Sequence, residues 1–192
     1  ALVTLSRYRG KDPFCDPFCG SGTIPIEAAL IAKNRAPGLD RSFAAQKWRN
    51  MDSRLWLDAA DEAMDKEFHG TYDIWGGDID PAAVELARHN AQLAGVEDCV
   101  RFEVADAAKF HRDSEYGQLV TNPPYGERLL EKREAEELYR VFGRAVRDLP
   151  PKWRVLVLSS HTEFERAFGR PADKKRKLYN GMLKCDVFQY GK

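Results

Sequence analysis

An apolar run that ends in an acid, a glycine-rich turn and a helical segment follow one another directly in this sequence, and that order constrains the fold most. Residues 14–16 form the run, residues 17–22 form the turn, and a helical pattern extends from Thr23 to about Ala36. Strand, tight turn and helix make the first half of a βαβ unit, whose strands are parallel. The chain is therefore expected to build a mainly parallel sheet.

The rest of the chain repeats this alternation of strands and helices. The expected strands are 72–75, which leads into Gly76–Asp80, and then 100–104, 118–121 and 153–158; the expected helices are 81–94, 131–149 and 162–168. Two further runs, 176–179 and 182–188, flank Asn180-Gly181, a dipeptide typical of two-residue hairpin turns. We predict a doubly wound, Rossmann-like α/β sheet with a C-terminal antiparallel β-hairpin.

Residues 39–70 interrupt the alternation. They carry Trp48 and Trp56 among charged residues and a helical pattern from about Ser53 to Phe68. We interpret this segment as an insertion within the domain and expect it to pack on the edge of the sheet.

Length, charge and cysteine content narrow the class of protein. The 192 residues suffice for one well-packed domain, and the 30 basic and 30 acidic residues cancel, so affinity for a polyanion must come from a local patch or another domain. No stretch approaches the roughly 20 apolar residues of a membrane span. Four scattered cysteines indicate a reducing compartment, and neither they nor the four histidines have metal-ligand spacing. We expect a cytoplasmic protein without membrane or metal; its oligomeric state stays open.

The turn after the first expected strand favours a cationic ligand. Asp16 presents a carboxylate before Gly20 and Gly22, whereas dinucleotide-binding turns offer helix N–H groups to a pyrophosphate and carry a third glycine, for which Pro25 stands here. S-adenosylmethionine, with an ammonium group and a sulfonium, suits these charges better. Taken alone, the glycines are also compatible with a tight structural turn.

The next two expected strands also end in acids. Asp78 suits the two hydroxyls of a ribose, while Asp80 precedes Pro81 and is expected to cap the following helix. Asp106 could accept from the adenine amino group, with Ala107 offering its backbone; a solvated loop aspartate is the alternative.

Asn122-Pro123-Pro124-Tyr125, after the fourth expected strand, is the most specific motif. The prolines fix the backbone and remove two donors, which leaves the Asn122 side-chain oxygen and the Pro123 carbonyl free to accept from one planar NH₂ group. Such hydrogen bonds would aim the nitrogen lone pair at the methyl group, and Tyr125 would stack on the ring that carries the amine. The alternative is a proline-rich structural turn after a buried strand.

Together these segments resemble the catalytic domain of the THUMP-linked class I RNA methyltransferases, which include bacterial large-subunit ribosomal RNA guanine-N2 enzymes. The similarity covers residues 16–29, 36–38 with Trp48, 78–81, Asn122 to Leu129 and 175–181. It implies a class I methyltransferase fold. The residues expected to hold the cofactor are Asp16, Phe18, Gly20, Ser21, Gly22, Thr23, Asp78, Ile79, Asp106, Ala107 and Asn122, and those expected to hold the target amine are Asn122, Pro123, Pro124 and Tyr125.

The resemblance also implies a partner and an arrangement of domains. In that family a THUMP RNA-binding domain precedes the catalytic domain, so we expect residues 1–192 to be a fragment whose missing part supplies much of the phosphate affinity. RNA, in particular ribosomal RNA, is the expected partner. The basic run 174–177 would contact the RNA backbone or be a solvated strand edge.

Guanine N2 in ribosomal RNA is the target that the resemblance favours, and the residues leave other substrates open. The same motif serves methylation of adenine N6 in DNA and of a glutamine amide in protein, because all these targets are planar NH₂ groups. A catalytically silent RNA-docking module is a further alternative, against which the intact Asn122 and Tyr125 argue.

Overall fold

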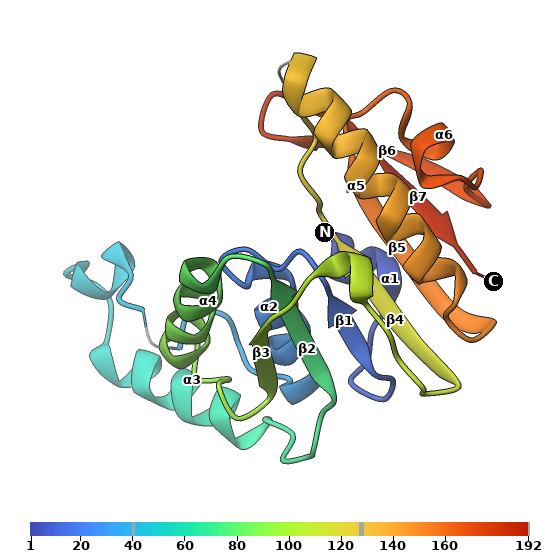
Figure 1. Ribbon diagram of the computed structural model, residues 1–192. Coiled ribbons are helices and arrows are strands. Elements are labelled where there is room, and N and C mark those ends of the chain that lie inside the picture. The colour runs from blue at the N-terminus through green and yellow to red at the C-terminus, as the bar shows by residue number, and fades with distance from the viewer. Residues whose placement is uncertain (40, 127–128, 192) are drawn as a thin grey trace.

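Seven strands form one mixed sheet in the computed structural model, which describes residues 1–39, 41–126 and 129–191 (Figure 1). The strands are β1 (Phe14–Asp16), β2 (Ile74–Asp78), β3 (Val100–Val104), β4 (Tyr116–Thr121), β5 (Lys152–Ser159), β6 (Lys174–Asn180) and β7 (Leu183–Tyr190). Their order is β3-β2-β1-β4-β5-β7-β6. Strands β1 to β5 are parallel, β7 runs antiparallel to β5, and β6 and β7 form the terminal hairpin. The predicted fold class is confirmed.

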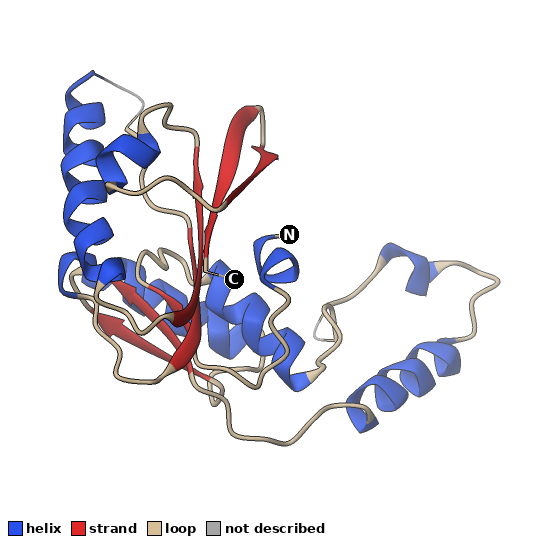
Figure 2. Cartoon of the chain, turned by 90° about the vertical axis from the view of Figure 1, so that its right-hand side faces the viewer, coloured by secondary structure: helices blue, strands red, loops and turns tan. Residues whose placement is uncertain are grey.

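Helices cover both faces of the sheet (Figure 2). Each face has its own hydrophobic core. α1 (Leu2–Ser6), α2 (Thr23–Lys33) and α4 (Pro81–Leu93) pack on one face, where their apolar residues join the inward side chains of the strands. The 3₁₀ turn η2 (Ala107–Lys109), α5 (Leu129–Arg147) and α6 (Phe164–Phe168) cover the other, which is rich in aromatic rings. Because both faces are covered, β4 and β5 are buried along almost their whole length, and β5 is continuously apolar from Val155 to Leu158. Among the described residues, no helix is long and apolar enough to cross a membrane.

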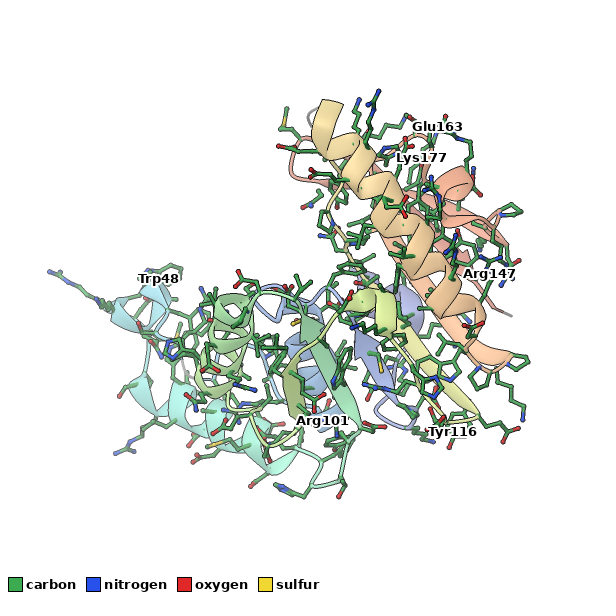
Figure 3. The ribbon with its side chains drawn as sticks, in the orientation of Figure 1. Trp48, Arg101, Tyr116, Arg147, Glu163 and Lys177 are labelled. Atoms are coloured by element: carbon green, nitrogen blue, oxygen red, sulfur yellow. The ribbon has the colours of Figure 1, made fainter. Side chains whose placement is uncertain are left out.

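The prediction that the insertion packs on the sheet edge is wrong. Its 3₁₀ turn η1 (Ala44–Lys47) and helix α3 (Ser53–Asp65) contribute no buried residue, and the segment extends away from the sheet, with Trp48 near its far end (Figure 3). Several contacts tie its C-terminal end to the end of α2 and the residues after it. Phe68 N–H donates to the Lys33 carbonyl (2.7 Å), Asn34 Nδ2 donates to the Lys66 carbonyl (3.0 Å), and Glu67 pairs with Arg35 and Lys33. The helical period is present in α3, but Leu55, Leu57 and Met64 remain exposed, and Trp56 stacks only on Phe43 of the same insertion among the rings of the described residues.

Several element boundaries differ from the prediction by one to three residues, and two of them lie beside the site. β2 begins at Ile74 and continues through both glycines to Asp78, because residues 76–78 pair with β3. The hairpin turn is Gly181-Met182, one residue later than predicted, since Asn180 pairs with Leu183. Gly181 has φ +61°, the conformation that a primed turn requires at its first central position.

Candidate functional site

Two adjoining cavities lie at the point where the strand order reverses, between β1 and β4. The first has a volume of about 630 Å³ and the second about 430 Å³. Phe18, Gly20 and Asn122 line both. Ligands of open α/β sheets bind at such a switch point, beyond the carboxyl ends of the strands. The two cavities together are therefore the candidate site, with Asn122 at their junction.

The structure brings nearly all the predicted residues to this site. The first cavity is lined by Asp16, Phe18, Gly20, Ser21, Thr23 and Asn122, and the second by Phe18, Gly20, Asp78, Ile79, Asp106, Ala107, Asn122, Pro123, Pro124 and Tyr125. Gly22 lines neither cavity. It has φ +84°, and a Cβ atom there would lie 2.9 Å from the Ala87 Cβ, so Gly22 allows the turn to pack against α4.

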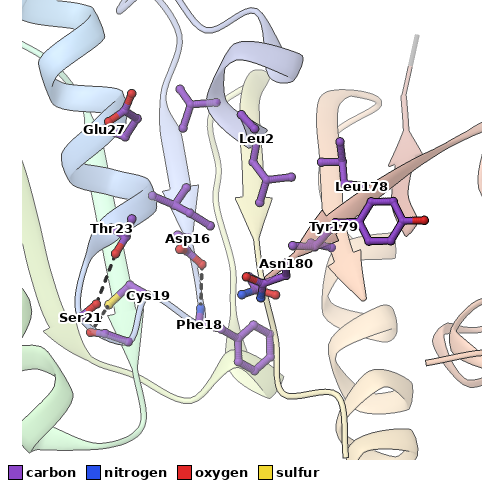
Figure 4. Close-up of a pocket in the computed structure, with 16 residues that line it drawn as sticks. Leu2, Asp16, Phe18, Cys19, Ser21, Thr23, Glu27, Leu178, Tyr179 and Asn180 are labelled. Atoms are coloured by element: carbon purple, nitrogen blue, oxygen red, sulfur yellow. Dashed lines mark hydrogen bonds between the residues drawn. The ribbon is translucent and has the colours of Figure 1, made fainter. Parts of the chain in front are cut away.

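Asp16, the last residue of β1, is a buried acid on the wall of the first cavity (Figure 4). Its Oδ1 accepts the Phe18 N–H (3.1 Å) and the Thr121 hydroxyl (2.5 Å). None of the described cationic side chains pairs with it, and burial raises the pKa of its carboxyl group to about 7, although the two hydrogen bonds oppose that shift. A buried carboxylate without a cation at a cavity wall suits a positively charged ligand.

The turn after β1 is held by Asp78, the last residue of β2. Asp78 Oδ2 accepts the Gly20 N–H (2.9 Å), and Oδ1 accepts the Asp80 N–H (3.0 Å). Each carboxylate oxygen keeps a further lone pair, so the oriented carboxylate can still accept from a ligand in the second cavity. Asp80 caps α4 by accepting the Ala82 N–H (2.9 Å), as predicted.

The end of β3 supplies the far wall of the second cavity. Asp106 Oδ1 accepts the Ala108 N–H (2.9 Å) and caps η2, while Ala107 is buried behind it. Ile79 is 72% exposed, an unusual position for an apolar side chain of this size, and it lines the same cavity. A planar apolar group with a polar edge could therefore contact the apolar Ile79 side chain and hydrogen-bond to the Asp106 carboxylate.

Asn122 and Tyr125 contact each other at the end of β4. The Tyr125 hydroxyl donates to Asn122 Oδ1 (2.5 Å), and Asn180 Nδ2 donates to the Tyr125 hydroxyl (3.4 Å). Asn122 Oδ1 has a second lone pair for an incoming amine. Burial raises the pKa of Tyr125 to about 12, so this hydroxyl stays protonated and remains a donor. Glu127 and Arg128, the next residues of the resemblance, lie outside the described residues.

Several contributors to the site were missed in the sequence, among them Thr121, which donates to Asp16, and three residues around the motif. Tyr139 of α5 donates its hydroxyl to the Pro124 carbonyl (2.5 Å) and also meets Ser159 Oγ (3.2 Å) at the end of β5. Asn180 reaches the motif from the hairpin. A tyrosine on an amphipathic helix is an ordinary core residue by pattern, so only the fold identifies Tyr139 as a support of the motif.

Comparison with known proteins gives consistent matches over almost the whole chain. Residues 1–189 match the family described as "RMKL-like, methyltransferase domain". YpsC of Bacillus subtilis (strain 168), named as an RNA methyltransferase, is 44% identical over 191 residues, which are 99% of this chain and 49% of YpsC. The ribosomal RNA large subunit methyltransferase K/L of Shewanella baltica (strain OS185) is 42% identical over 189 residues, 96% of this chain and 27% of that protein.

Solved structures agree with these matches. SMU.472, solved in complex with SAH, superposes with a TM-score of 0.93 at 43% identity, covering 99% of this chain and 51% of SMU.472. A Listeria monocytogenes structure named as an N6-adenine-specific DNA methylase gives a TM-score of 0.92 at 44% identity, covering 100% of this chain and 50% of that one. The chain thus spans about half the length of these structures and half or less of the curated relatives.

Proposed function

The chain belongs to the RMKL-like methyltransferase domain family, and from that premise we propose that it transfers the methyl group of S-adenosylmethionine to an exocyclic amino group of a nucleobase in RNA, with guanine N2 of ribosomal RNA as the target. One observation carries the proposal: Asn122 of the Asn-Pro-Pro-Tyr motif lies where the two cavities meet. The first cavity is lined by the buried Asp16, which has no ion-pair partner among the described residues, and the second by the Asp78 and Asp106 carboxylates.

The residues present fit S-adenosylmethionine. Asp16 would accept its ammonium group, Asp78 its ribose hydroxyls, and Asp106, Ala107 and Ile79 would border its adenine. When bound, the cofactor supplies an electrophilic methyl group. The rest of the chemistry is alignment, because Asn122 and the Pro123 carbonyl would hold the two amine hydrogens and so direct the nitrogen lone pair.

The RNA assignment is supported by the curated relatives. Both YpsC and the K/L enzyme are named for methylation of RNA. The Listeria structure carries a DNA methylase name, and a DNA adenine would present the same kind of NH₂ group to Asn122. In either nucleic acid, a paired base would have to be flipped out of its helix to reach the site.

Calorimetric titration of the folded, full-length protein with S-adenosylmethionine tests the enzyme assignment. We expect one site per chain, with affinity weakened about tenfold or more in Asp78→Ala, because that variant loses the carboxylate that faces the ribose. Asp98→Ala, an acid with a 70% exposed side chain, serves as the control and is expected to bind normally. A folded protein without binding would contradict the assignment.

Tyr139→Phe is expected to lower kcat about tenfold and to leave the Kd of the cofactor within about twofold. The hydroxyl holds the Pro124 carbonyl, so its loss frees the motif to shift without touching the cofactor residues. Single-turnover methyl transfer and calorimetry measure the two effects. Tyr116→Phe, at the opposite end of β4, is the matched control; an equal loss of cofactor affinity in Tyr139→Phe would contradict a role in positioning the motif.

The exposed edge strand β6 offers a test of RNA contact. Lys174, Arg176 and Lys177 form no ion pair among the described residues, whereas Lys175 pairs with Glu165 (2.8 Å). Changing the first three to Gln is expected to reduce the slope of log K against log salt for RNA binding by about 2, because each lost phosphate contact removes about 0.7–0.9. Lys175→Gln is the control with a smaller effect. An unchanged slope in the triple variant would mean that these side chains of β6 are solvated and do not contact RNA.

A further inference from the structure

A third cavity, of about 720 Å³, lies beside the motif on the side of β5 and the hairpin. We call it the His161 cavity; its lining includes Tyr125, Lys132, Glu136, His161, Glu163 and Lys184. Tyr125 also lines the second cavity, so its side chain forms a wall common to both. Glu163 lies at the same end of the molecule as Lys177 of the edge strand (Figure 3).

His161, one of the lining residues, carries a buried donor that forms no hydrogen bond within the described part of the chain. Its Nδ1 accepts the Glu163 N–H (3.1 Å), so the ring hydrogen is on Nε2. The side chain is only 5% exposed, and among residues 1–39, 41–126 and 129–191 nothing forms a hydrogen bond with Nε2. Buried donors are nearly always satisfied, and leaving one free destabilises the fold. Because His161 also lines a cavity, this unpaired donor is a candidate contact for a ligand.

An acceptor lies next to that donor. Glu136 Oε1 is 3.6 Å from His161 Nε2, too far for a hydrogen bond, and Oε2 is 3.7 Å from an Arg166 nitrogen. A donor and a carboxylate thus stand side by side on the cavity wall without bonding to each other. A ligand that carries one hydrogen-bond acceptor next to its donors could bond to both the His161 donor and the Glu136 carboxylate.

The cavity also carries positively charged side chains. Lys132 of α5 and Lys184 of β7 line it, and within the described part of the chain neither forms an ion pair. Glu163, the other acid of the lining, is paired with Arg166 (2.8 Å). Two free ammonium groups beside a polar edge suit a phosphate joined to a base.

The loop of His161 is physically connected to the motif. His161 N–H donates to Ser159 Oγ (3.1 Å), Ser159 meets the Tyr139 hydroxyl (3.2 Å), and Tyr139 donates to the Pro124 carbonyl. The cavity and the candidate site therefore share one hydrogen-bonded frame, and a ligand in one lies at a fixed position relative to the other.

We propose that the His161 cavity holds a guanosine nucleotide that neighbours the target nucleotide in the RNA. Guanine presents the acceptor O6 beside the donors N1–H and N2–H, which match the His161 donor and the two oxygens of the Glu136 carboxylate. Lys132 and Lys184 would meet its phosphate. Adenine and cytosine offer one donor group beside an acceptor, and uracil offers one donor between two acceptors, so each leaves a carboxylate oxygen unused. This assignment rests on the proposed RNA substrate.

Nuclear magnetic resonance of the full-length protein, labelled with ¹⁵N at histidine, tests the site directly. The probes are guanosine, adenosine, cytidine and uridine 5′-monophosphates and ribose 5-phosphate, and His161→Asn identifies the Nε2–H signal. We expect the guanosine nucleotide to shift that signal with an affinity at least about tenfold above the other nucleotides, and ribose 5-phosphate to leave it in place. Equal shifts by all nucleotides, or none, would overturn the proposal.

A second measurement places the site in the reaction. Glu136→Gln is expected to raise KM for RNA about tenfold with an unchanged Kd for S-adenosylmethionine, while Glu137→Gln, an exposed neighbour paired with Arg140, changes neither. Equal KM values in the two variants would contradict a contact with RNA. A wrong proposed function would give a different result. The unaltered protein would then bind no S-adenosylmethionine or methylate no RNA, while the nucleotide titration would still shift the His161 signal as expected.

Discussion

Asn122→Ala is expected to lower methyl transfer about a hundredfold or more and to leave the affinity for S-adenosylmethionine nearly intact. The variant removes the side-chain oxygen that would hold one amine hydrogen, and misalignment of reacting groups costs about that factor. It removes none of the carboxylates that we propose for the cofactor, since Asp16, Asp78 and Asp106 keep their own backbone hydrogen bonds. Single-turnover kinetics measure the first effect and calorimetry the second.

Asn180→Ala is the matched control for that experiment. It removes an amide of the same kind from the same cavity, but the one hydrogen bond of its Nδ2 within the described residues is a long one, to the Tyr125 hydroxyl at 3.4 Å. We expect less than about a threefold change in rate from so long a hydrogen bond. If Asn122→Ala lowered rate and cofactor affinity equally, Asn122 would belong to the cofactor half of the site.

Asp16→Asn is expected to weaken cofactor binding by about a hundredfold at pH 7.5, because the ammonium group would lose a desolvated anionic partner. The amide keeps the shape and can still accept the Phe18 N–H and meet Thr121. In the unaltered protein the affinity should rise with pH up to about 7, where Asp16 loses its proton, and then level off. Calorimetry between pH 5.5 and 7.5 should show that rise and its absence in the variant.

The same substitution should stabilise the unliganded protein at neutral pH. The pKa of Asp16 is raised from 3.8 to about 7 on folding, so between these values the folded state binds the proton more tightly, and stability falls as pH rises through that window. Asp16→Asn avoids this loss. Thermal unfolding at pH 8 should therefore show a higher Tm than the unaltered protein, with the difference shrinking toward pH 4. A lower Tm at pH 8 would mean that the buried carboxylate stabilises the fold.

The elements that surround the site were predictable because their sequence patterns are local. An apolar run followed by an acid, glycine or proline marks the end of a buried strand, and Asp80 before Pro81 marks a helix cap. Parallel strands then bring these ends together, so Asp16, Asp78 and Asn122 could be assigned to one edge of the sheet before any contact was known.

What could not be predicted depends on contacts between distant residues. The period of α3 does not reveal that its apolar side chains stay exposed, because burial depends on the element that it meets. The contact of Tyr125 with Asn122 and the support that Tyr139 gives to Pro124 require side-chain geometry. The hairpin turn shifted by one residue because the pairing of β6 with β7 sets the register.

Nucleoside mass spectrometry tests the central claim most directly. Unmodified ribosomal RNA and, separately, DNA are incubated with the full-length protein and methyl-labelled S-adenosylmethionine and are then digested to nucleosides. We predict labelled N2-methylguanosine from the RNA, which disappears in Asn122→Ala, and no labelled nucleoside from the DNA. Label confined to N6-methyladenine in DNA, or no labelled nucleoside from either polymer, would contradict the account.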